Sequence, residues 1–435
     1  MKKINVLFDY SVILDVEISG EGRAGIYMVT KNILQQFINN EIFNVTLFSS
    51  NPKIKYFAGN LPYLFSNEEL KNRCNYNINV HHNKIKNTNN IFIIVWRYLK
   101  ILKNKLYFFL FNIKEQNLNI DNYDIFFSPV YQTPDIIDNY NKIKTFIILH
   151  DCIPVLKDIL YPKVNDDFWL FRLIQKLNKE TYYFCVSECT KNDFLKIAPS
   201  QLEESKMIVT PIAASRVFFP KYSRDILGKV LKKYGVKLNP EDKYIFSFST
   251  IEPRKNIFFT IKCFLEFIKR NKIDNISFYL GGGQWLDYFN QFLNSLSEFS
   301  YYRNKIILLG YINDEDVNIL YSNSMFFVYL SQYEGFGIPP LEAMQAGTPV
   351  ITSNNSSLPE VVGDAAITIT YNDEEACIKA FENLYFSEEL RKYYIEKGIE
   401  RAKLFSWEKT FDKMSNVIIN TVRNQDELVD TYLAP

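Results

Sequence analysis

The amino-acid sequence predicts an α/β protein in which two doubly wound parallel sheets follow one another along the chain. Short apolar runs alternate with segments of helical apolar spacing, such as residues 257–269, over most of the 435 residues. Continuous apolar strands separated by helices are typical of parallel sheets covered by helices on both faces. Eleven such strands are too many for one small domain, and the pattern restarts near Tyr244.

The expected strands divide into six before Tyr244 and five from there on. In chain order they are INVLF, NVTLFSS, DIFFSPV, TFIILHD, YYFCVS and KMIVTPI, then YIFSFST, ISFYLGG, KIILLG, MFFVYLS and PVITS. Prolines and the charged segment RDILGKVLKKYG between residues 211 and 240 indicate the connection between the domains. We therefore expect domains at residues 1–215 and 216–405, followed by a terminal segment at 406–435. Ligands of such sheets bind beyond the carboxyl ends of the strands.

Composition excludes several classes of function. The net charge of +1 gives no basic field for nucleic acid. The six cysteines form no C-x-x-C pair and there are three histidines, which argues against a structural zinc site and for reduced thiols in the cytoplasm. Asp9 interrupts the apolar run at the N-terminus, which favours a buried strand over a signal peptide. No apolar run is long enough to cross a membrane, so we expect a soluble or peripheral protein.

The segment at residues 84–114 departs from the alternation of strands and helices. It is basic and aromatic and contains no acidic residue. Arg97, Lys100 and Lys103 share one helical face, which suggests a helix on a membrane surface. An ordinary core helix with a solvated basic edge explains the same pattern.

The stretch SQYEGFGIPPLEAMQAGTPVI contains two glutamates after a buried strand. We expect Glu334 on the loop and Glu342 in the first turn of the short helix that Pro339 and Pro340 open. The two carboxylates could flank one ligand, and the free N–H groups at the helix start favour an anion such as a diphosphate. The alternative is two solvated glutamates, one of them complementing the helix dipole.

Arg254 and Lys255, in FSFSTIEPRKNIFFTIKCF, stand where another strand gives way to a helix. Cations at a helix start oppose the dipole, so a phosphate ligand explains them better than solvation does. The glycines at residues 281–283 follow a further strand and predict a tight turn.

In the first domain, Gly25 lies between a strand and a helix, where backbone could approach a phosphate or sugar; a plain loop is the alternative. His150 and Asp151 end a buried strand at the edge where ligands bind, although a lone histidine is more often structural. Residues 314–316 (DED) open a helix, so capping and the dipole explain them without a metal. Neither a G-x-S-x-G elbow nor a Walker lysine motif is present.

These motifs together resemble the family 4 retaining glycosyltransferases with the GT-B fold. The matching segments are STIEPRKN, GGG, LLGYINDEDVNILY, YEGFGIPPLEAMQAGTPVI and LPEVVGDAA, in order between residues 249 and 366. The first domain matches more loosely, through GRAGIYMVTKNIL, LHDCIP and VSECTKNDF. The resemblance implies two Rossmann-like domains whose parallel sheets face a central cleft, with a terminal helix (residues 407–422) that crosses back to the first domain.

The resemblance also implies roles for the residues of the second domain. Glu342 would bind the ribose hydroxyls of a nucleotide sugar, and Glu334 would bind the hydroxyls of the donor sugar. Backbone N–H groups around Phe336, Gly337 and Ile338 would assist there and at the diphosphate.

Arg254 and Lys255 would neutralise the diphosphate leaving group, so neither a metal nor another cofactor is expected. His150 would lie near the donor sugar and the acceptor. Two donor-binding candidates depart from the family pattern: Ser249 stands where glycine is common, and Gly25 belongs to a loop with fewer glycines than in some members.

The sequence thus predicts a retaining, metal-independent glycosyltransferase that acts on a nucleotide-diphosphate sugar and a glycan or lipid-linked acceptor. Synthesis of a bacterial surface polysaccharide or glycolipid, in the cytoplasm or at the inner face of its membrane, is the expected setting. The resemblance implies front-face attack, with the leaving phosphate accepting the acceptor's proton. The alternatives are a catalytically silent partner subunit of an active transferase and an epimerase or phosphorylase of the same fold. The nucleotide, the sugar, the acceptor and the oligomeric state stay open.

Overall fold

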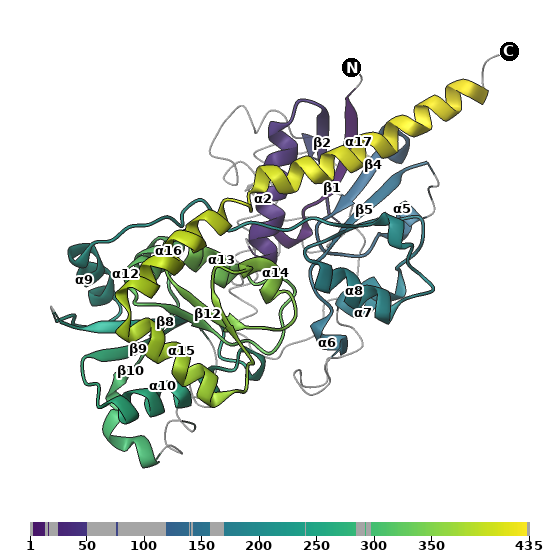
Figure 1. The fold of residues 1–435 in the computed structure, drawn as a ribbon. Helices are drawn as coiled ribbons and strands as arrows, with labels where there is room; N and C mark the ends of the chain where they lie inside the picture. Colours follow the sequence, from purple (N-terminus) through teal and green to yellow (C-terminus); the bar gives the residue numbers. More distant parts are fainter. Residues whose placement is uncertain are drawn as a thin grey trace, which may run out of the picture.

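A computed structural model describes residues 3–13, 16, 25–49, 75–76, 119–138, 140, 142–156, 169–239, 241–283, 292 and 297–432. Two lobes, each built on a twisted sheet with helices around it, follow one another along the chain (Figure 1). The basic, aromatic segment expected at residues 84–114 lies outside the described residues.

The first sheet contains seven parallel strands in the order β3-β2-β1-β4-β5-β6-β7. The strands are β1 (Ile4–Asp9), β2 (Phe43–Phe48), β3 (Asn75–Tyr76), β4 (Ile125–Ser128), β5 (Lys144–Leu149), β6 (Tyr182–Cys185) and β7 (Met207–Val209). The helices are α2 (Gly25–Asn39), α5 (Asp135–Asp138), α6 (Ile153–Leu156), α7 (Trp169–Gln175) and α8 (Glu188–Ile197), with short 3-10 turns at Ile120–Asn122 and Glu204–Lys206. All six strands expected from the sequence are present, and the two-residue β3 was not predicted.

The second sheet contains six parallel strands in the order β10-β9-β8-β11-β12-β13. The strands are β8 (Lys243–Phe248), β9 (Ile276–Gly281), β10 (Ile306–Gly310), β11 (Phe327–Tyr329), β12 (Val350–Ser353) and β13 (Ile367–Ile369). The helices are α9 (Arg224–Lys233), α10 (Ile257–Asn271), α12 (Asp314–Asn323), α13 (Ile338–Gln345), α14 (Leu358–Val362), α15 (Glu374–Phe386), α16 (Glu388–Ala402) and α17 (Trp407–Tyr432), with 3-10 turns at Pro253–Lys255 and Ser297–Lys305. The five expected strands and the helix expected at 257–269 are confirmed, whereas β13 was not predicted.

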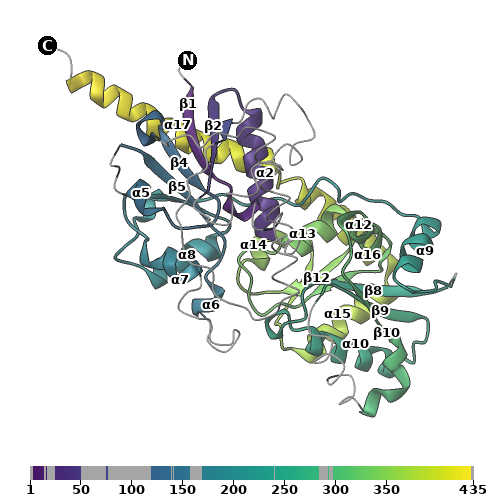
Figure 2. The ribbon, with the colours of Figure 1, turned by 180° about the vertical axis from the view of Figure 1, so that it is seen from behind.

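Helix α17 leaves the second lobe and lies along the first, as the views from both sides show (Figures 1 and 2). The ring of Phe411 on α17 lies 4.8 Å from that of Phe37 on α2 and 5.9 Å from that of Phe43, both in edge-to-face geometry. Phe411 and Phe37 are almost completely buried. Burial of such rings is worth roughly 2 to 3 kcal/mol each, so this contact is part of the hydrophobic core of the first lobe.

Local sequence explains where helix α12 begins. The side chain of Asn313 caps the helix by accepting a hydrogen bond from the Asp316 N–H at 2.9 Å. Asp314 and Glu315 follow in the first turn, where their charges complement the helix dipole. The cap and the dipole account for Asp314 and Glu315 as the sequence predicted. The buried carboxylate of Asp316, however, also pairs with Lys233 at 3.0 Å and accepts from the Tyr234 hydroxyl at 2.9 Å, which was not predicted.

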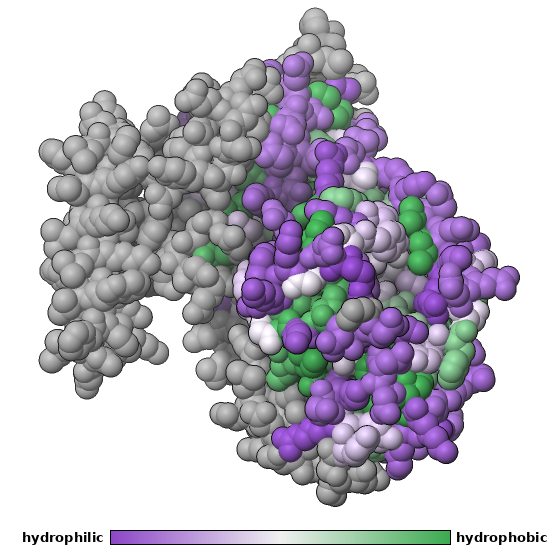
Figure 3. Space-filling model, turned by 90° about the vertical axis from the view of Figure 1, so that its left-hand side faces the viewer, coloured by the Kyte–Doolittle hydropathy of each residue, from purple (hydrophilic) through white to green (hydrophobic). Residues whose placement is uncertain are grey.

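One side of the second lobe is mainly hydrophilic, with apolar patches scattered between charged and polar side chains (Figure 3). Scattered apolar groups are ordinary on the surface of a globular protein. Across the described helices, none combines the length and the apolar character that crossing a bilayer requires.

Candidate active site

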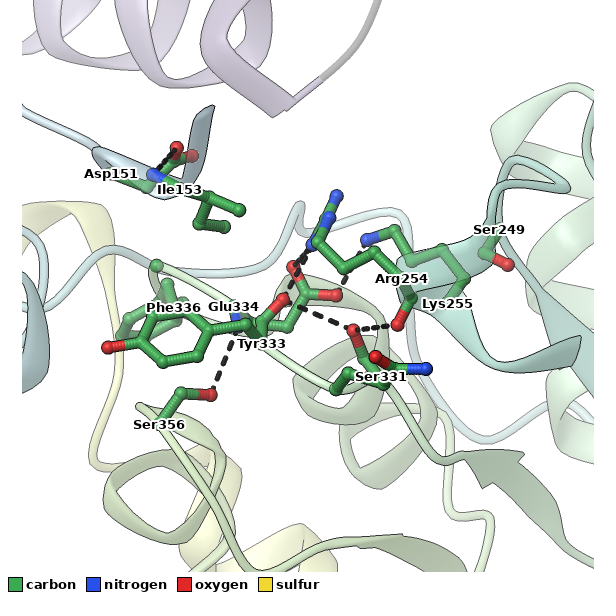
Figure 4. Close-up of polar contacts among 12 residues, drawn as sticks. Asp151, Ile153, Ser249, Arg254, Lys255, Ser331, Tyr333, Glu334, Phe336 and Ser356 are labelled. Carbon is green, nitrogen blue, oxygen red and sulfur yellow. Dashed lines mark hydrogen bonds and ion pairs between the residues drawn. The ribbon is translucent and has the colours of Figure 1, made fainter. Parts of the chain in front are cut away.

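Glu334 lies at the carboxyl edge of the second sheet, on the loop between β11 and α13. Its carboxylate is buried, with a residue exposure of 8%. One oxygen, Oε1, accepts hydrogen bonds from Lys255 Nζ at 2.7 Å and from the Tyr329 hydroxyl at 2.8 Å. The other, Oε2, lies 2.9 Å from Arg254 Nη1 (Figure 4). Glu334 is therefore held between two cations and a phenol.

Arg254 and Lys255 come from the 3-10 turn that follows β8, the strand beside β11 in the sheet. Arg254 also pairs with Glu252 at 2.8 Å and donates from Nη1 to the carbonyl of Tyr333 at 2.7 Å. Lys255 Nζ donates to the Tyr329 hydroxyl at 2.7 Å. Both cations thus converge on the Glu334 loop, a pairing that sequence reasoning did not predict.

The electrostatics of this cluster follow from burial and ion pairing together. Burial acts to raise the pKa of Glu334, but Lys255 and Arg254 outweigh it and lower the pKa to about 2. Burial lowers the pKa of Lys255, and Glu334 opposes that effect. At neutral pH the Glu334 carboxylate is therefore ionised and anchored to the guanidinium of Arg254.

Glu342 occupies a different environment from Glu334. The sequence placed it in the first turn of its helix, and that placement is wrong: α13 begins at Ile338 and has no acidic residue in its first turn. The helix starts before its prolines because Gly337, with φ 112°, adopts the left-handed conformation at the N-cap. Glu342 Oε2 accepts from the Tyr321 hydroxyl at 3.2 Å. Burial, with a contribution from Asp314, raises the pKa of Glu342 to about 8.

The residues at the start of α13 are closely packed. The ring of Phe336 is buried and packs edge to face on Phe405 at 5.9 Å. Gly337 has φ 112°, and a Cβ there would lie 2.7 Å from the side chain of Leu358, so a larger residue would be strained at this position. A Cβ on Gly25 would lie 3.4 Å from Ile338, which places the start of α2 in the first lobe against the start of α13.

Ser249 and the glycine turn lie at the same edge of the second sheet. Ser249 is partly buried, and its hydroxyl donates to the carbonyl of Thr250 at 3.1 Å. Gly282 has φ 115°, and a Cβ at this position would lie only 2.0 Å from the carbonyl oxygen of Ser249. Gly282 is therefore the residue that requires glycine, while the tight turn expected at residues 281–283 stays a prediction.

The first lobe contributes the residues that follow β5. The His150 ring is buried, and its Nε2–H donates to the carbonyl of Pro129 at 2.7 Å. Burial lowers the pKa of His150 to about 4, so the ring is neutral at pH 7. Burial raises the pKa of Asp151, whose charge also senses Arg254 and Glu334. Asp151 therefore lies within electrostatic reach of the cluster, whereas the ring of His150 is committed to the backbone of its own lobe.

Sequence reasoning missed Tyr329, Tyr333 and Ser356. Tyr329 joins Lys255 to Glu334, Tyr333 O accepts from Arg254, and Ser356 Oγ accepts from the Glu334 N–H at 3.0 Å. Tyr329 ends β11, and that position at the carboxyl edge is the one signal that could have found it. Among the residues that the structure describes, no group of three histidine, cysteine or acidic side chains is placed to hold a metal ion.

The second lobe also matches a known family model. Residues 232–401 match the model described as "Glycosyl transferases group 1". This part of the chain is a glycosyl transferases group 1 domain. The sequence-based prediction of a glycosyltransferase is thereby confirmed, and the match contains Arg254, Lys255, Glu334 and Glu342.

The curated proteins that are similar to this chain include bacterial mannosyltransferases. The chain is 29% identical over 279 residues to "O-antigen chain mannosyltransferase B" of Escherichia coli, covering 64% of this chain and 71% of that protein. It is 26% identical over 273 residues to "Serotype-specific mannosyltransferase WbdA" of Escherichia coli. That alignment covers 61% of this chain but only 32% of WbdA.

Solved glycosyltransferase structures share the whole architecture. WaaG, "a glycosyltransferase involved in lipopolysaccharide biosynthesis", superposes with a TM-score of 0.62 at 13% identity, covering 95% of this chain and 99% of WaaG. Anabaena Alr3699/HepE in complex with UDP-glucose gives 0.62 at 14% identity, covering 96% and 100%. At such identities the likeness shows the fold alone. The chain has the GT-B fold that the sequence predicted.

Proposed function

We propose that this glycosyltransferase is a retaining, metal-independent enzyme of family 4 that transfers a sugar from a nucleotide-diphosphate donor to a glycan or lipid-linked acceptor. Bacterial surface polysaccharide or glycolipid synthesis is the proposed setting, in the cytoplasm or at the inner face of its membrane. The mannosyltransferases among the relatives support mannose as the first sugar to test.

The observation that carries the proposal is the buried cluster of Arg254, Lys255 and Glu334 at the carboxyl edge of the second sheet. Two cations at this edge can bind the diphosphate of a donor and stabilise the charge that develops on it as the sugar leaves. Their present partner, Glu334, is released when the diphosphate takes its place. The freed carboxylate can then accept hydrogen bonds from the hydroxyls of the donor sugar.

The protonation states of the site favour front-face attack. Glu334, with a pKa of about 2, is a weak base. The neutral ring of His150 donates its Nε2–H to Pro129 and has a pKa of about 4, so it is also a poor acceptor of the acceptor's proton. The leaving phosphate, held by Arg254 and Lys255, is then the base nearest to the attacking hydroxyl. Because the ring of His150 is bound to Pro129, we propose that His150 lies near the acceptor and the donor sugar through its backbone and not through its ring.

Residues of α13 and its surroundings bind the rest of the donor. Glu342 accepts the ribose hydroxyls, and the backbone N–H groups around Gly337 and Ile338 assist at the diphosphate. Ser249 and Gly25 border the donor from the β8 edge and from the first lobe.

A transfer assay with a panel of sugar nucleotides tests the proposal. GDP-mannose and UDP-glucose are each offered with lipid-linked and free glycan acceptors, in buffer with and without EDTA, and the anomeric configuration of the product is read by NMR. We expect transfer with retention that EDTA does not abolish, and an increase in melting temperature with the accepted donor. Inversion of the anomeric configuration would contradict the proposal of a retaining enzyme. Loss of activity with EDTA would contradict the proposal of a metal-independent one. Donor binding without transfer to any acceptor would favour the silent partner subunit, and interconversion of the sugar nucleotide itself would favour the epimerase.

A further inference from the structure

Helix α8 of the first lobe contacts the Glu334 loop on both sides of Glu334. The Tyr333 hydroxyl donates to the Asp193 carboxylate, at 2.9 Å from Oδ1 and 2.8 Å from Oδ2. The carbonyl of Gly335 accepts from the hydroxyls of Ser187 at 2.6 Å and Thr190 at 3.0 Å. We call these five residues the α8 clamp. The residues immediately before and after Glu334 are thus attached to the opposite lobe.

Tyr333 connects the α8 clamp to the charged cluster. Its hydroxyl is bound to Asp193, while its carbonyl accepts the Arg254 Nη1–H at 2.7 Å. Figure 4 shows Tyr333 next to Glu334 on this loop, with Arg254 reaching in from the turn after β8. Tyr333 thus links Asp193, through its hydroxyl, to Arg254, through its carbonyl.

The two lobes approach closely at Gly335. A Cβ at this position would lie 2.2 Å from the His150 carbonyl and 2.7 Å from Asp151 Cβ. No side chain fits in that space, so glycine is required here for packing and not for its backbone angles. The clamp therefore holds the loop in direct contact with the end of β5.

A second set of contacts fixes α8 against the second lobe. The Glu360 carboxylate accepts from the N–H groups of Glu188 at 2.8 Å and Cys189 at 2.7 Å, at the start of α8. Helix N-termini favour negative charge, so this contact stabilises the docked arrangement. Glu360 belongs to α14, and the Ser357 hydroxyl at the start of α14 donates to the carbonyl of Glu334 at 2.9 Å. The Glu334 loop is accordingly enclosed between α8, α14 and the Arg254 turn.

We propose that Asp193 is a positioning residue for Glu334 and Arg254, acting across the lobe interface through Tyr333. In this proposal Asp193 acts through Tyr333 and not through contact with the donor or the acceptor. Its carboxylate fixes the phenol of Tyr333, so the donor half of the site has its working geometry only when the first lobe is docked. The inference rests on the proposed function, because it assigns Asp193 a part in the same transfer reaction.

The test uses Tyr333→Phe, Asp193→Asn and the double variant. Tyr333→Phe removes the hydrogen bond, whereas Asp193→Asn removes its charge and leaves an amide oxygen as a weaker acceptor. Both changes keep the shape of the side chain almost unchanged. We expect kcat for transfer to fall about tenfold in Tyr333→Phe and less in Asp193→Asn, with KM little changed, because the lost bond aligns the site and does not bind substrate. The double variant should lose no more than Tyr333→Phe alone, since both changes act on one interaction.

Tyr183→Phe is the matched control. The Tyr183 hydroxyl is buried in the first lobe, where it accepts from the Asn178 N–H at 3.0 Å and donates to the Asn178 carbonyl at 3.2 Å. This variant should lower the melting temperature while kcat stays unchanged. An equal loss of kcat in Tyr183→Phe, or multiplied losses in the Tyr333→Phe/Asp193→Asn double variant, would overturn the proposal.

Hydrogen–deuterium exchange on the full chain without donor or acceptor separates the clamp from the proposed function. We expect faster exchange in peptides covering residues 187–191 and 332–338 in both single variants, and no further increase in the double variant. Unchanged exchange would overturn the clamp even if the chain is an active transferase. Faster exchange together with unchanged kcat would refute the positioning role, and a wild-type chain that transfers no sugar would refute the proposed function alone.

Discussion

Replacing Glu334 with glutamine should destabilise the second domain, because it leaves two buried cations without their shared anion. The pKa of Glu334 is about 2 in the folded chain against an ordinary value of 4.5. A difference of about 2.5 units corresponds to about 3 kcal/mol of folding free energy, at about 1.36 kcal/mol per unit. Breaking a buried ion pair from one side costs a similar amount. We therefore expect Glu334→Gln to lose about 3 kcal/mol at pH 7.

The pH dependence gives the sign of the effect. Because the folded pKa lies below the unfolded value, the stabilisation is fully present above about pH 4.5 and is lost as the pH falls toward 2. Urea unfolding of the wild type, followed by hydrogen exchange in peptides of β11 and α13, should show this loss. The variant should lack it, and its stability at pH 7 should recover in part with inorganic pyrophosphate, which can pair with Arg254 and Lys255.

Glu266→Gln is the control for this prediction. Glu266 lies on α10 in the same domain and pairs with Arg270 at 2.8 Å and Lys269 at 3.7 Å, but both cations are partly exposed. Surface pairs of this kind contribute under about 1 kcal/mol. If Glu334→Gln were no less stable than Glu266→Gln, or gained nothing from pyrophosphate, the electrostatic reasoning for the site would be refuted.

Three further predictions concern the donor site and the lobe interface. Arg254→Lys loses the planar guanidinium that binds Glu334, Glu252 and the Tyr333 carbonyl, so kcat should fall about a hundredfold or more. An unchanged kcat in a steady-state assay would argue against a role of Arg254 at the leaving group. Glu342 has a pKa of about 8 in the free chain and must lose a proton to accept hydrogen bonds from the ribose hydroxyls. The affinity for a sugar nucleotide should therefore rise by up to about tenfold per pH unit from pH 6 to pH 8. Calorimetry should find this slope absent in Glu342→Gln. Gly335→Ala places a Cβ 2.2 Å from the His150 carbonyl and should lower the melting temperature by several degrees, whereas Gly228→Ala, with open space around it, should not.

The sequence was sufficient for the strands and for the edge at which the site lies. Apolar runs are a strong signal, so all eleven expected strands are present. The two-residue β3 carries too little pattern to be seen, and β13 (ITI), whose middle residue is polar and exposed, lacks a continuous apolar run. The sequences of the strands do not predict the order in which the strands lie in the sheet. Arg254 and Glu334 meet because β8 and β11 are neighbours in the sheet, and that adjacency comes from the fold.

Side-chain partners were harder to predict than positions. His150 was expected near the donor, and the sequence could not reveal that its ring is bound to Pro129. The prolines lie in the first turn of α13 as expected, but the helix begins at Ile338, before Pro339, so Glu342 falls beyond that turn. The domain boundaries at 215/216 and 405/406 and the roles of the site residues stay predictions.

The packing of α17 on α2 also bears on how the protein is made in the cell. A chain emerging from the ribosome presents Phe37 and Phe43 long before Phe411 has been synthesised, so their apolar surface stays uncovered while the whole second domain is translated. The first lobe can complete its core only after that delay, and apolar surface exposed in the interval favours aggregation. A product truncated before α17 would contain every residue of the charged cluster and still expose this surface, and surveillance by proteases would remove it.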